Sequence, residues 1–315
     1  MIPAILAATD PADDELAPLR GLRARYQGAM LGLAVGDALA AATQFRRPGS
    51  FTPVGDLLGG GPFDLPCGAW SDDTAMALCL AESLVECEGF DARDQLERYG
   101  RWQRDGYLSA TGQCLGITAG TARALSMAPE PHRAGGGAGD PEALALPAEP
   151  LSRVAPVVLH AFAEPERAVA LAAEAARATC RSGQVQDACR ALAAMLHAAL
   201  RGEPRERILA PAGAVLAAGG APEESRGALA VLERACWAFG STGSFREGAL
   251  RAVNLGGDSD VIGAVYGQIA GAHYGVEAIP APWRRLLARE ELIVRLGDGL
   301  LSQALLRLAE LGAES

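Results

Sequence analysis

Two short acidic clusters lie far apart in this chain, and each comes directly before a segment whose apolar residues recur at helical spacing. The first cluster, SDDT at 71–74, leads into AMALCLAESLVE, and the second, GGDSD at 256–260, leads into VIGAVYGQIAGAHYG. Serine favours the N-cap position of a helix, so Ser71 and Ser259 are the expected caps. The sequence therefore predicts four carboxylates at the N-termini of two helices.

These carboxylates have two explanations. An aspartate in the first turn of a helix complements the helix dipole and contributes about 0.3–1 kcal/mol at an exposed site, which accounts for one aspartate per helix. Crowded carboxylates repel one another unless a cation lies between them, so two acidic pairs also indicate a metal site. The pairs are Asp72 with Asp73 and Asp258 with Asp260. Oxygen ligands with almost no histidine nearby suit magnesium, manganese or calcium rather than zinc.

Glycines indicate how the helices that carry these residues pack. Three glycines at four-residue intervals recur in each of two helical segments: Gly28, Gly32 and Gly36 in the first, and Gly263, Gly267 and Gly271 in the second. Each costs a helix interior about 1 kcal/mol relative to alanine, so the repeat needs a packing reason. We expect close packing of these helices in a core, against each other or against the helix after Asp73.

Asp37 is the one acidic residue on the first glycine-rich helix, where it lies among Val35, Ala38 and Leu39. Burying a carboxylate is costly unless it is hydrogen-bonded or near a cation. We expect a buried structural role in preference to direct metal binding, with a solvent-facing position as the alternative.

Composition favours a helical protein. The chain has 315 residues, half of them apolar and only 5% aromatic, and alanine, leucine, glutamate and arginine are abundant. These residues favour helix over sheet, so the sequence predicts an all-α class. The formal charge is −10, from 28 basic and 38 acidic residues, which argues against a nucleic-acid-binding surface spread over the protein. A local basic patch is compatible with this charge.

The cysteines and the N-terminus bear on the cellular compartment. Seven cysteines include no CxxC pair, and an odd number cannot form a closed set of disulfides. The first residues lack the basic region of a signal peptide, and no stretch has the length of an uncharged membrane span. We expect a cytoplasmic protein with reduced thiols and no membrane partner.

The chain divides into few parts. Residues 1–20 are rich in Pro, Ala and Asp and are expected to be a flexible lead-in. Residues 21–315 are expected to form a single all-helical domain, in which 129–150 is a flexible loop and 46–69 an ordered one. The tail from Pro280 has the pattern of an amphipathic helix.

Four stretches together resemble the ADP-ribosylglycohydrolase family, and they occur in the order found in that family. They are GAMLGLAVGDALAAATQF (28–45), GAWSDDTAMALCLAESL (68–84), RVAPVVL (153–159) and NLGGDSDVIGAVYGQIAGAHYG (254–275). The resemblance implies a compact, multi-helix all-α fold whose metal-binding cleft holds two ions, magnesium or manganese. It also implies that ADP-ribose, attached to a protein or to a small acceptor, is the substrate.

The same resemblance assigns roles to the acidic clusters. The residues that match the metal ligands of the family are Ser71, Asp72, Asp73, Asp258 and Asp260. The metals would orient the ribose hydroxyls and lower the pKa of a bound water that attacks the anomeric carbon. A nearby carboxylate, Asp260 or Asp73, would take the proton from that water.

Several positions depart from the family pattern. Gln44 stands where the family has a glutamate near the metals and the substrate, and Val261 where a threonine hydroxyl completes the shell of the second metal. On the substrate side, Cys180 corresponds to a histidine and Gly116 to an acidic residue in a CFDIG-like stretch. AEPLS at 148–152 replaces an Asn-Gly-Ser-type segment. These changes imply a weakened second metal site.

Three interpretations therefore remain. The chain is a metal-dependent hydrolase that removes ADP-ribose from a modified side chain or small acceptor, with altered acceptor or metal preference. Alternatively, it is a catalytically weak or inactive relative that binds ADP-ribose. In the third interpretation the acidic clusters are structural, and no metal-dependent thermal shift is expected.

Overall fold

Helices make up the regular structure. The computed structural model describes residues 16–127, 147–218 and 227–314, where extended pairing is limited to a bridge between Gly60 and Leu65. The α-helices are α2 (Ala17–Ala40), α3 (Asp72–Glu86), α4 (Ala92–Asp105), α5 (Ala119–Ser126), α6 (Ala155–His160), α7 (Pro165–Ala176), α8 (Gly183–Leu200), α9 (Arg205–Ala218), α10 (Ala228–Gly240), α11 (Phe245–Val253), α12 (Ser259–Tyr274), α13 (Ala281–Leu286) and α14 (Glu290–Glu314). Short 3₁₀-helices are η1 (Gly61–Phe63), η2 (Glu149–Arg153) and η4 (Val276–Ala278). The predicted all-α class is confirmed, and none of these helices is both long and apolar enough to cross a bilayer.

The glycine faces of α2 and α12 pack directly on each other in antiparallel order. The opposed pairs are Gly28 with Gly271, Gly32 with Gly267, and Gly36 with Gly263. A Cβ atom on Gly32 would lie 2.2 Å from the carbonyl oxygen of Gly267, and one on Gly267 would lie 1.9 Å from that of Gly32. Because real Cβ atoms do not approach so closely, this contact requires glycine on both helices. The prediction that the glycine faces pack closely is confirmed, with each face as the partner of the other.

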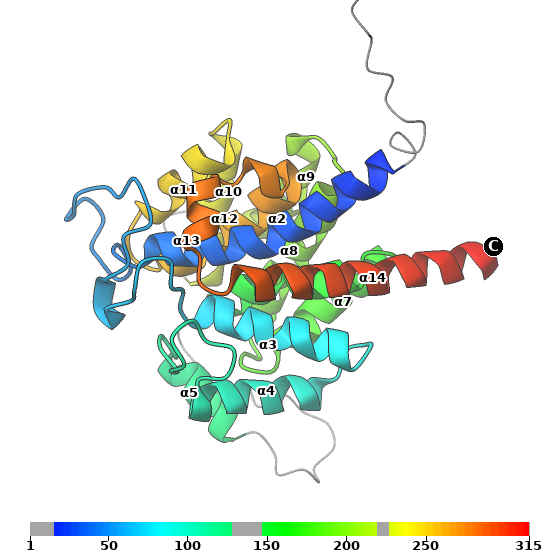
Figure 1. Cartoon of the computed structure of the whole chain (residues 1–315), viewed down its shortest axis with the longest axis horizontal. Coiled ribbons are helices and arrows are strands. Elements are labelled where there is room, and N and C mark those ends of the chain that lie inside the picture. Colours follow the sequence, from blue (N-terminus) through cyan, green and yellow to red (C-terminus); the bar gives the residue numbers. More distant parts are fainter. Residues whose placement is uncertain (1–15, 128–146, 219–226, 315) are drawn as a thin grey trace, which may run out of the picture.

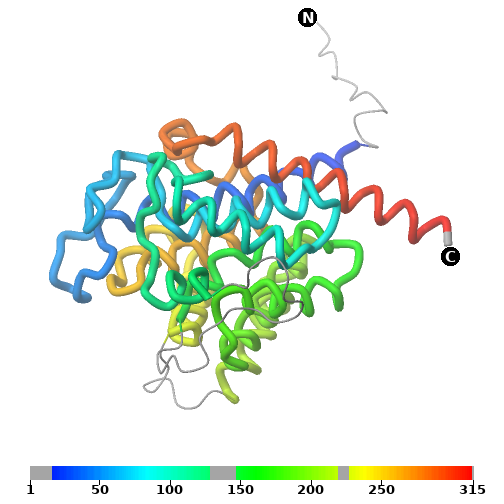
Figure 2. Tube along the Cα trace, turned by 90° about the horizontal axis from the view of Figure 1, so that it is seen from below, coloured from blue at the N-terminus to red at the C-terminus, as the bar shows by residue number. Residues whose placement is uncertain are grey.

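Antiparallel packing sets the place of the acidic residues. It puts the C-terminal end of α2 beside the N-terminal end of α12, and Asp37 near that end of α2 bonds to the first residues of α3. In Figure 1, α2 runs along the long axis of the molecule with α14 beside it. Figure 2 gives a second view of these helices, in which the loop after α2 lies at the opposite end of the molecule from the C-terminus. Three helix ends that are remote in sequence therefore meet, as predicted.

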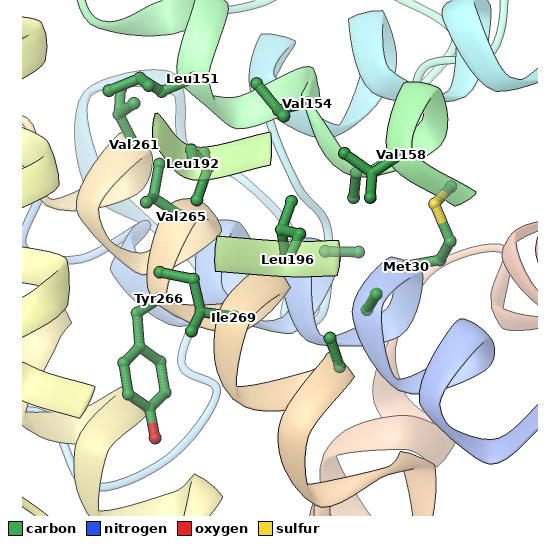
Figure 3. Packing of buried hydrophobic residues seen from close by; sticks show 14 of the residues in the cluster. Met30, Leu151, Val154, Val158, Leu192, Leu196, Val261, Val265, Tyr266 and Ile269 are labelled. Atoms are coloured by element: carbon green, nitrogen blue, oxygen red, sulfur yellow. The ribbon is translucent and has the colours of Figure 1, made fainter. Parts of the chain in front are cut away.

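A large apolar core holds these helices in place. Figure 3 shows one part of it, where α12 contributes Val265 and Ile269 and α8 contributes Leu192 and Leu196. These four side chains are at most 1% exposed. Burying a side chain of this size contributes roughly 1.5–3 kcal/mol, so the core fixes the helices whose ends form the site.

Several predicted boundaries were wrong. Most of the predicted lead-in and of the predicted loop, residues 1–15 and 128–146, lies outside the described ranges. Helix α2 begins at Ala17, so the helical domain starts before the predicted residue 21. The loop predicted at 129–150 ends earlier, because Glu149 and Pro150 belong to η2 and are buried. The tail after Pro280 is two helices, because the backbone N–H of Ala288 leaves the helical pattern and donates to Gly68 O at 2.9 Å.

Candidate active site at three helix ends

A side chain from another helix caps the N-terminus of α3. Asp37 is 1% exposed and accepts hydrogen bonds of 2.6–3.1 Å from the backbone N–H and the hydroxyl of both Ser71 and Thr74. Burial raises the pKa of Asp37, and these hydrogen bonds oppose the rise. The expected structural role of Asp37 is confirmed. Ser71 does stand at the N-cap position, but its own side chain makes no capping bond, because Asp37 fills that role.

Asp72 and Asp73 are left free of the capping role in the first turn of α3. Asp72 is 5% exposed and Asp73 is 2% exposed. Neither carboxylate oxygen of Asp73 has a hydrogen-bond partner in the described part of the chain. Ser152 lies close enough to lower the pKa of Asp73, but its hydroxyl donates to Glu149 O at 2.7 Å. A buried carboxylate without a donor is costly, so Asp73 is poised to accept a proton or bind a cation.

The second cluster is built differently. Asp258, and not the predicted Ser259, is the N-cap residue of α12; it is exposed and its side chain makes no capping bond. Ser259 is the first helical residue, and its hydroxyl lies 3.0 Å from the Thr43 hydroxyl. Asp260 is 5% exposed, and Gln44 Nε2 donates to its Oδ2 while Oδ1 has no partner in the described residues. The segment after α2 therefore holds this cluster.

The carboxylates of the two clusters act on one another. Burial raises the pKa of Asp72 to about 7. Burial also raises the pKa of Asp73 well above its usual range, and the charges of Asp72 and Asp260 raise it further. Burial raises the pKa of Asp260 in the same way, with Asp72 as the next cause. Although Asp258 is exposed, partial desolvation raises the pKa of its carboxyl. The helix ends thus gather mutually repelling carboxylates, as the sequence predicted.

The predicted metal ligands suit a divalent cation in their chemistry; they are Ser71, Asp72, Asp73, Asp258 and Asp260. Three of their carboxylate oxygens are buried without a partner among the described residues: both of Asp73 and Oδ1 of Asp260. The Ser71 hydroxyl donates to Asp37, which leaves its oxygen lone pairs available. Such oxygens are the ligands that hard cations prefer. As they stand, however, no three His, Cys, Asp or Glu side chains of the described chain are arranged to hold a metal ion.

The predicted substrate-side residues have different surroundings. Gln44 lies in the site, bonded to Asp260. Gly116 lies against Asp72, because a Cβ atom at this position, where φ is +89°, would lie 2.1 Å from Asp72 Oδ1. Cys180 is 3% exposed and lies in the core beside Cys189. Contact of Gln44, Gly116 and Cys180 with substrate stays a prediction.

Val261 lies among apolar side chains. It is 5% exposed and belongs to the cluster shown in Figure 3, which includes Leu151. A valine at this position supplies no oxygen ligand and fits its apolar surroundings. The prediction that the second metal site is weaker is consistent with this position and stays a prediction.

Sequence reasoning missed Glu149. It is 8% exposed, lies at the start of η2, and raises the pKa of Asp72 and of Asp258. It falls within residues 129–150, which the sequence predicted to be a flexible loop. The departure of AEPLS from the family pattern was the available signal, since it marked residues 148–152 as a segment close to the site.

Comparison with known proteins is consistent with this arrangement. A family model described as ADP-ribosylglycohydrolase matches residues 18–311. A solved structure titled "ADP-ribosylglycohydrolase-related protein complex" is 42% identical to the chain and has a TM-score of 0.78. The match covers 90% of this chain and 99% of that one.

The chain is also similar to proteins that are named as hydrolases of ADP-ribosylated substrates. The "ADP-ribosylarginine hydrolase Tri1" of Serratia proteamaculans is 34% identical over 294 residues, which cover 89% of this chain and 80% of the relative. The protein of the same name from Pseudomonas putida is 33% identical, with 89% and 78% covered. The "ADP-ribosyl-[dinitrogen reductase] glycohydrolase" of Rhodospirillum rubrum is 29% identical, with 89% and 96% covered.

Proposed function

The chain belongs to the ADP-ribosylglycohydrolase family, and we infer from this membership that it is an ADP-ribosyl glycohydrolase enzyme. Its reaction is the hydrolytic removal of ADP-ribose from a modified protein. The structural observation that supports this inference is a group of buried carboxylates where three helix ends meet, with oxygens of Asp73 and Asp260 unbonded among the described residues. Hydrolysis at a glycosidic carbon needs such a base.

We propose arginine as the modified acceptor residue. Two relatives that are 34% and 33% identical carry the name ADP-ribosylarginine hydrolase, and both matches cover 89% of this chain. In the reaction, water adds to the anomeric carbon of the ribose and the bond from that carbon to the guanidine nitrogen breaks. The freed guanidine takes up a proton, so ADP-ribose and unmodified arginine are the products.

We propose that the activity depends on magnesium or manganese, with two ions in a cleft and the second held more weakly. The residues that would hold them are Ser71, Asp72, Asp73, Asp258 and Asp260. Bound divalent ions supply the means to orient ribose hydroxyls and to lower the pKa of water. The unpartnered oxygens of Asp73 and Asp260 support this proposal, because buried carboxylates at such density need a compensating charge.

Asp73 and Asp260 are the proposed catalytic bases. A raised pKa makes a carboxylate a stronger base near neutral pH, and burial raises the pKa of both well above the usual range. Among the described residues neither oxygen of Asp73 has a hydrogen-bond partner, whereas Oδ2 of Asp260 is bonded to Gln44. Asp73 is therefore the first choice for the group that takes the proton from the attacking water.

One observation favours a second candidate function, ADP-ribose binding with weak or no hydrolysis. Gln44 places an amide on Asp260, where the family resemblance implied a glutamate. An amide carries no negative charge to bind a cation, and its N–H donates to Asp260 and stabilises the ionised carboxylate. It therefore reduces both metal binding and basicity at this cluster.

We propose a cytoplasmic location for the enzyme, in which an ADP-ribosylated protein is its substrate. All seven cysteines lie in the described ranges, where no disulfide joins them, which supports a reducing compartment.

The deciding experiment combines calorimetry with a release assay. ADP-ribose is titrated into the protein in EDTA and in manganese or magnesium, and release from ADP-ribosylated arginine and serine peptides is measured in parallel. We expect metal-dependent binding, and release from the arginine peptide. Binding without release from either peptide would support the second candidate. Absence of binding and release would contradict both functions.

A further inference from the structure

An exposed basic and aromatic loop lies directly against the second acidic cluster. The backbone N–H of Phe45 donates to Gly257 O at 2.8 Å, and the N–H of Gly257 donates to Arg46 O at 2.8 Å. A Cβ atom on Gly256 would lie 2.5 Å from Arg46 O, so the two segments are in close contact. The residues Phe45, Arg46 and Arg47, here called the rim loop, therefore have a fixed position next to Asp258.

Phe45 is unusual among aromatic residues in its exposure and in its backbone conformation. Its side chain is 59% exposed, and its backbone has a φ of +59°, a left-handed conformation that is unfavourable for a bulky residue. The two backbone hydrogen bonds to Gly257 hold it in this conformation. Its ring meets the ring of Phe63 edge to face, with centroids 6.4 Å apart. The result is an aromatic side chain on a hydrogen-bonded backbone that is presented to solvent.

Arg46 and Arg47 carry positive charges that pair with no carboxylate of the described residues. Both are exposed, and among the described residues neither guanidinium takes part in an ion pair or a side-chain hydrogen bond. Arg46 lies 5.9 Å from the centroid of the Phe51 ring. The chain as a whole has a formal charge of −10. Against this background, the two arginines beside the second acidic cluster form a local positive rim.

We propose that the rim loop is a docking surface for the acceptor protein and that it selects acidic sequence around the ADP-ribosylated arginine. This inference rests on the proposed function. An acidic protein repels an acidic partner at long range, whereas two exposed arginines and an aromatic ring give a complementary surface beside the site. Phe45 follows Gln44, which bonds to Asp260, so a segment that contacts this ring lies close to the carboxylates.

Three substrates test the proposal: free ADP-ribosylarginine, and two peptides in which one ADP-ribosylated arginine is flanked by Asp and Glu or by Lys and Arg. We expect wild-type kcat/KM to be about tenfold higher for the acidic peptide than for the basic one, falling with added salt. Arg46→Glu with Arg47→Glu should reverse this preference. Phe45→Ala should lower kcat/KM for both peptides severalfold, whereas Phe45→Tyr, which keeps an aromatic ring, should have kcat/KM close to that of wild type. Free ADP-ribosylarginine should be hydrolysed within twofold of wild type by every variant.

A matched control reverses two exposed arginines elsewhere, Arg93 in α4 and Arg295 in α14, and gives the same net charge. Arg93→Glu with Arg295→Glu should keep the preference for the acidic peptide. An equal loss on free ADP-ribosylarginine would overturn the proposal, since the rim loop would then bind ADP-ribose itself. Equal wild-type rates on both peptides would also overturn it. If wild type hydrolyses none of the three substrates, the proposed function fails and this inference fails with it.

Discussion

The two acidic clusters present their carboxylates in opposite ways. At the first, Asp37 takes over the helix cap, so both oxygens of Asp73 are buried and unbonded in the described chain. At the second, Asp258 is exposed at the N-cap, and Asp260 is bonded to Gln44. Each cluster has two aspartates at the N-terminus of a helix. At the first, the Asp37 side chain of another helix makes the capping bonds, so Asp72 and Asp73 do not have to make them.

This difference separates two roles. The first cluster is enclosed, and its free oxygens can act on a proton or a cation. The second is open on one side, where Gly257 joins it to the exposed loop at Phe45 and Arg46. We infer that the first cluster carries most of the basicity of the site and that the second contributes more to ligand and acceptor contact. The following predictions test this division.

The largest expected effect is on catalysis by the enclosed cluster. Asp73→Asn should lower kcat on an ADP-ribosylated arginine peptide about a thousandfold, which corresponds to about 4 kcal/mol, because it removes the proposed base. Asp258→Asn should act mainly on KM and lower kcat by about tenfold or less. Equal losses of kcat in the two variants would show that the clusters do not divide the work in this way.

The next effect is on stability. Asp37→Ala removes the acceptor for four donor groups at the start of α3 and should lower the free energy of unfolding by about 3 kcal/mol. Asp258→Ala, at the corresponding helix entrance, breaks no capping bond and should change it by about 0.5 kcal/mol or less. Urea unfolding in EDTA measures both. Asp37→Asn keeps one acceptor oxygen and should fall between them.

Stability should also depend on pH when metal is absent. A carboxyl with a higher pKa in the folded chain binds its proton more tightly there, so its contribution is present below the unfolded pKa and lost as pH rises to the folded pKa. Burial raises the pKa of Asp72 to about 7, and those of Asp73 and Asp260 rise as well. The free energy of unfolding should therefore fall between about pH 4 and 7, by up to about 1.4 kcal/mol per pH unit for each carboxyl.

Urea unfolding in EDTA at several pH values measures this slope. The carboxyls of Asp94 and Asp298 have lowered pKa values, so their contributions change only below about pH 4. Burial lowers the pKa of His160, His197 and His273, so their contributions to stability increase as pH rises to about 6.5 and oppose the fall. Asp73→Asn should flatten the slope more than Asp258→Asn does. Saturating manganese should remove it. Equal slopes for wild type and Asp73→Asn in EDTA would contradict the prediction.

The glycine contact could be predicted from the sequence because glycine destabilises a helix wherever it occurs and here it recurs at regular spacing. Six glycines at four-residue spacing, each unfavourable alone, leave close backbone approach as the explanation. The crowding of the aspartates likewise indicated a metal site, and the family resemblance then assigned roles to these residues. These signals depend on residue type and spacing, which a single sequence contains.

Hydrogen-bond partners remote in sequence could not be predicted in the same way. Ser71 and Ser259 have the residue type of an N-cap, yet Asp37 caps α3 and Asp258 is the N-cap residue of α12. Which acceptor reaches the N-terminus of α3 depends on the tertiary position of α2, which follows from packing. Glu149 was missed for a related reason, because composition alone cannot tell where a flexible segment ends and a buried turn begins.

The smallest predicted effect is a gain at the second cluster. Gln44→Glu replaces the amide that donates to Asp260 with a carboxylate, and Val261→Thr adds a hydroxyl at the start of α12. Together they should tighten binding of the second divalent ion by about tenfold, or about 1.4 kcal/mol, measured by manganese calorimetry. In EDTA the same variant should be less stable by roughly 1–3 kcal/mol, since Asp260 loses a donor and gains a like charge.

Gln44→Ala provides the control for that variant, because it removes the amide without adding an oxygen ligand. It should lose stability in EDTA without a gain in manganese affinity, which separates ligand addition from the release of Asp260. If the double variant binds manganese with the wild-type stoichiometry and affinity, then the glutamine does not limit the second ion. The two clusters would then differ in their hydrogen bonding alone. The bond from Gln44 to Asp260 would leave the affinity for manganese unchanged.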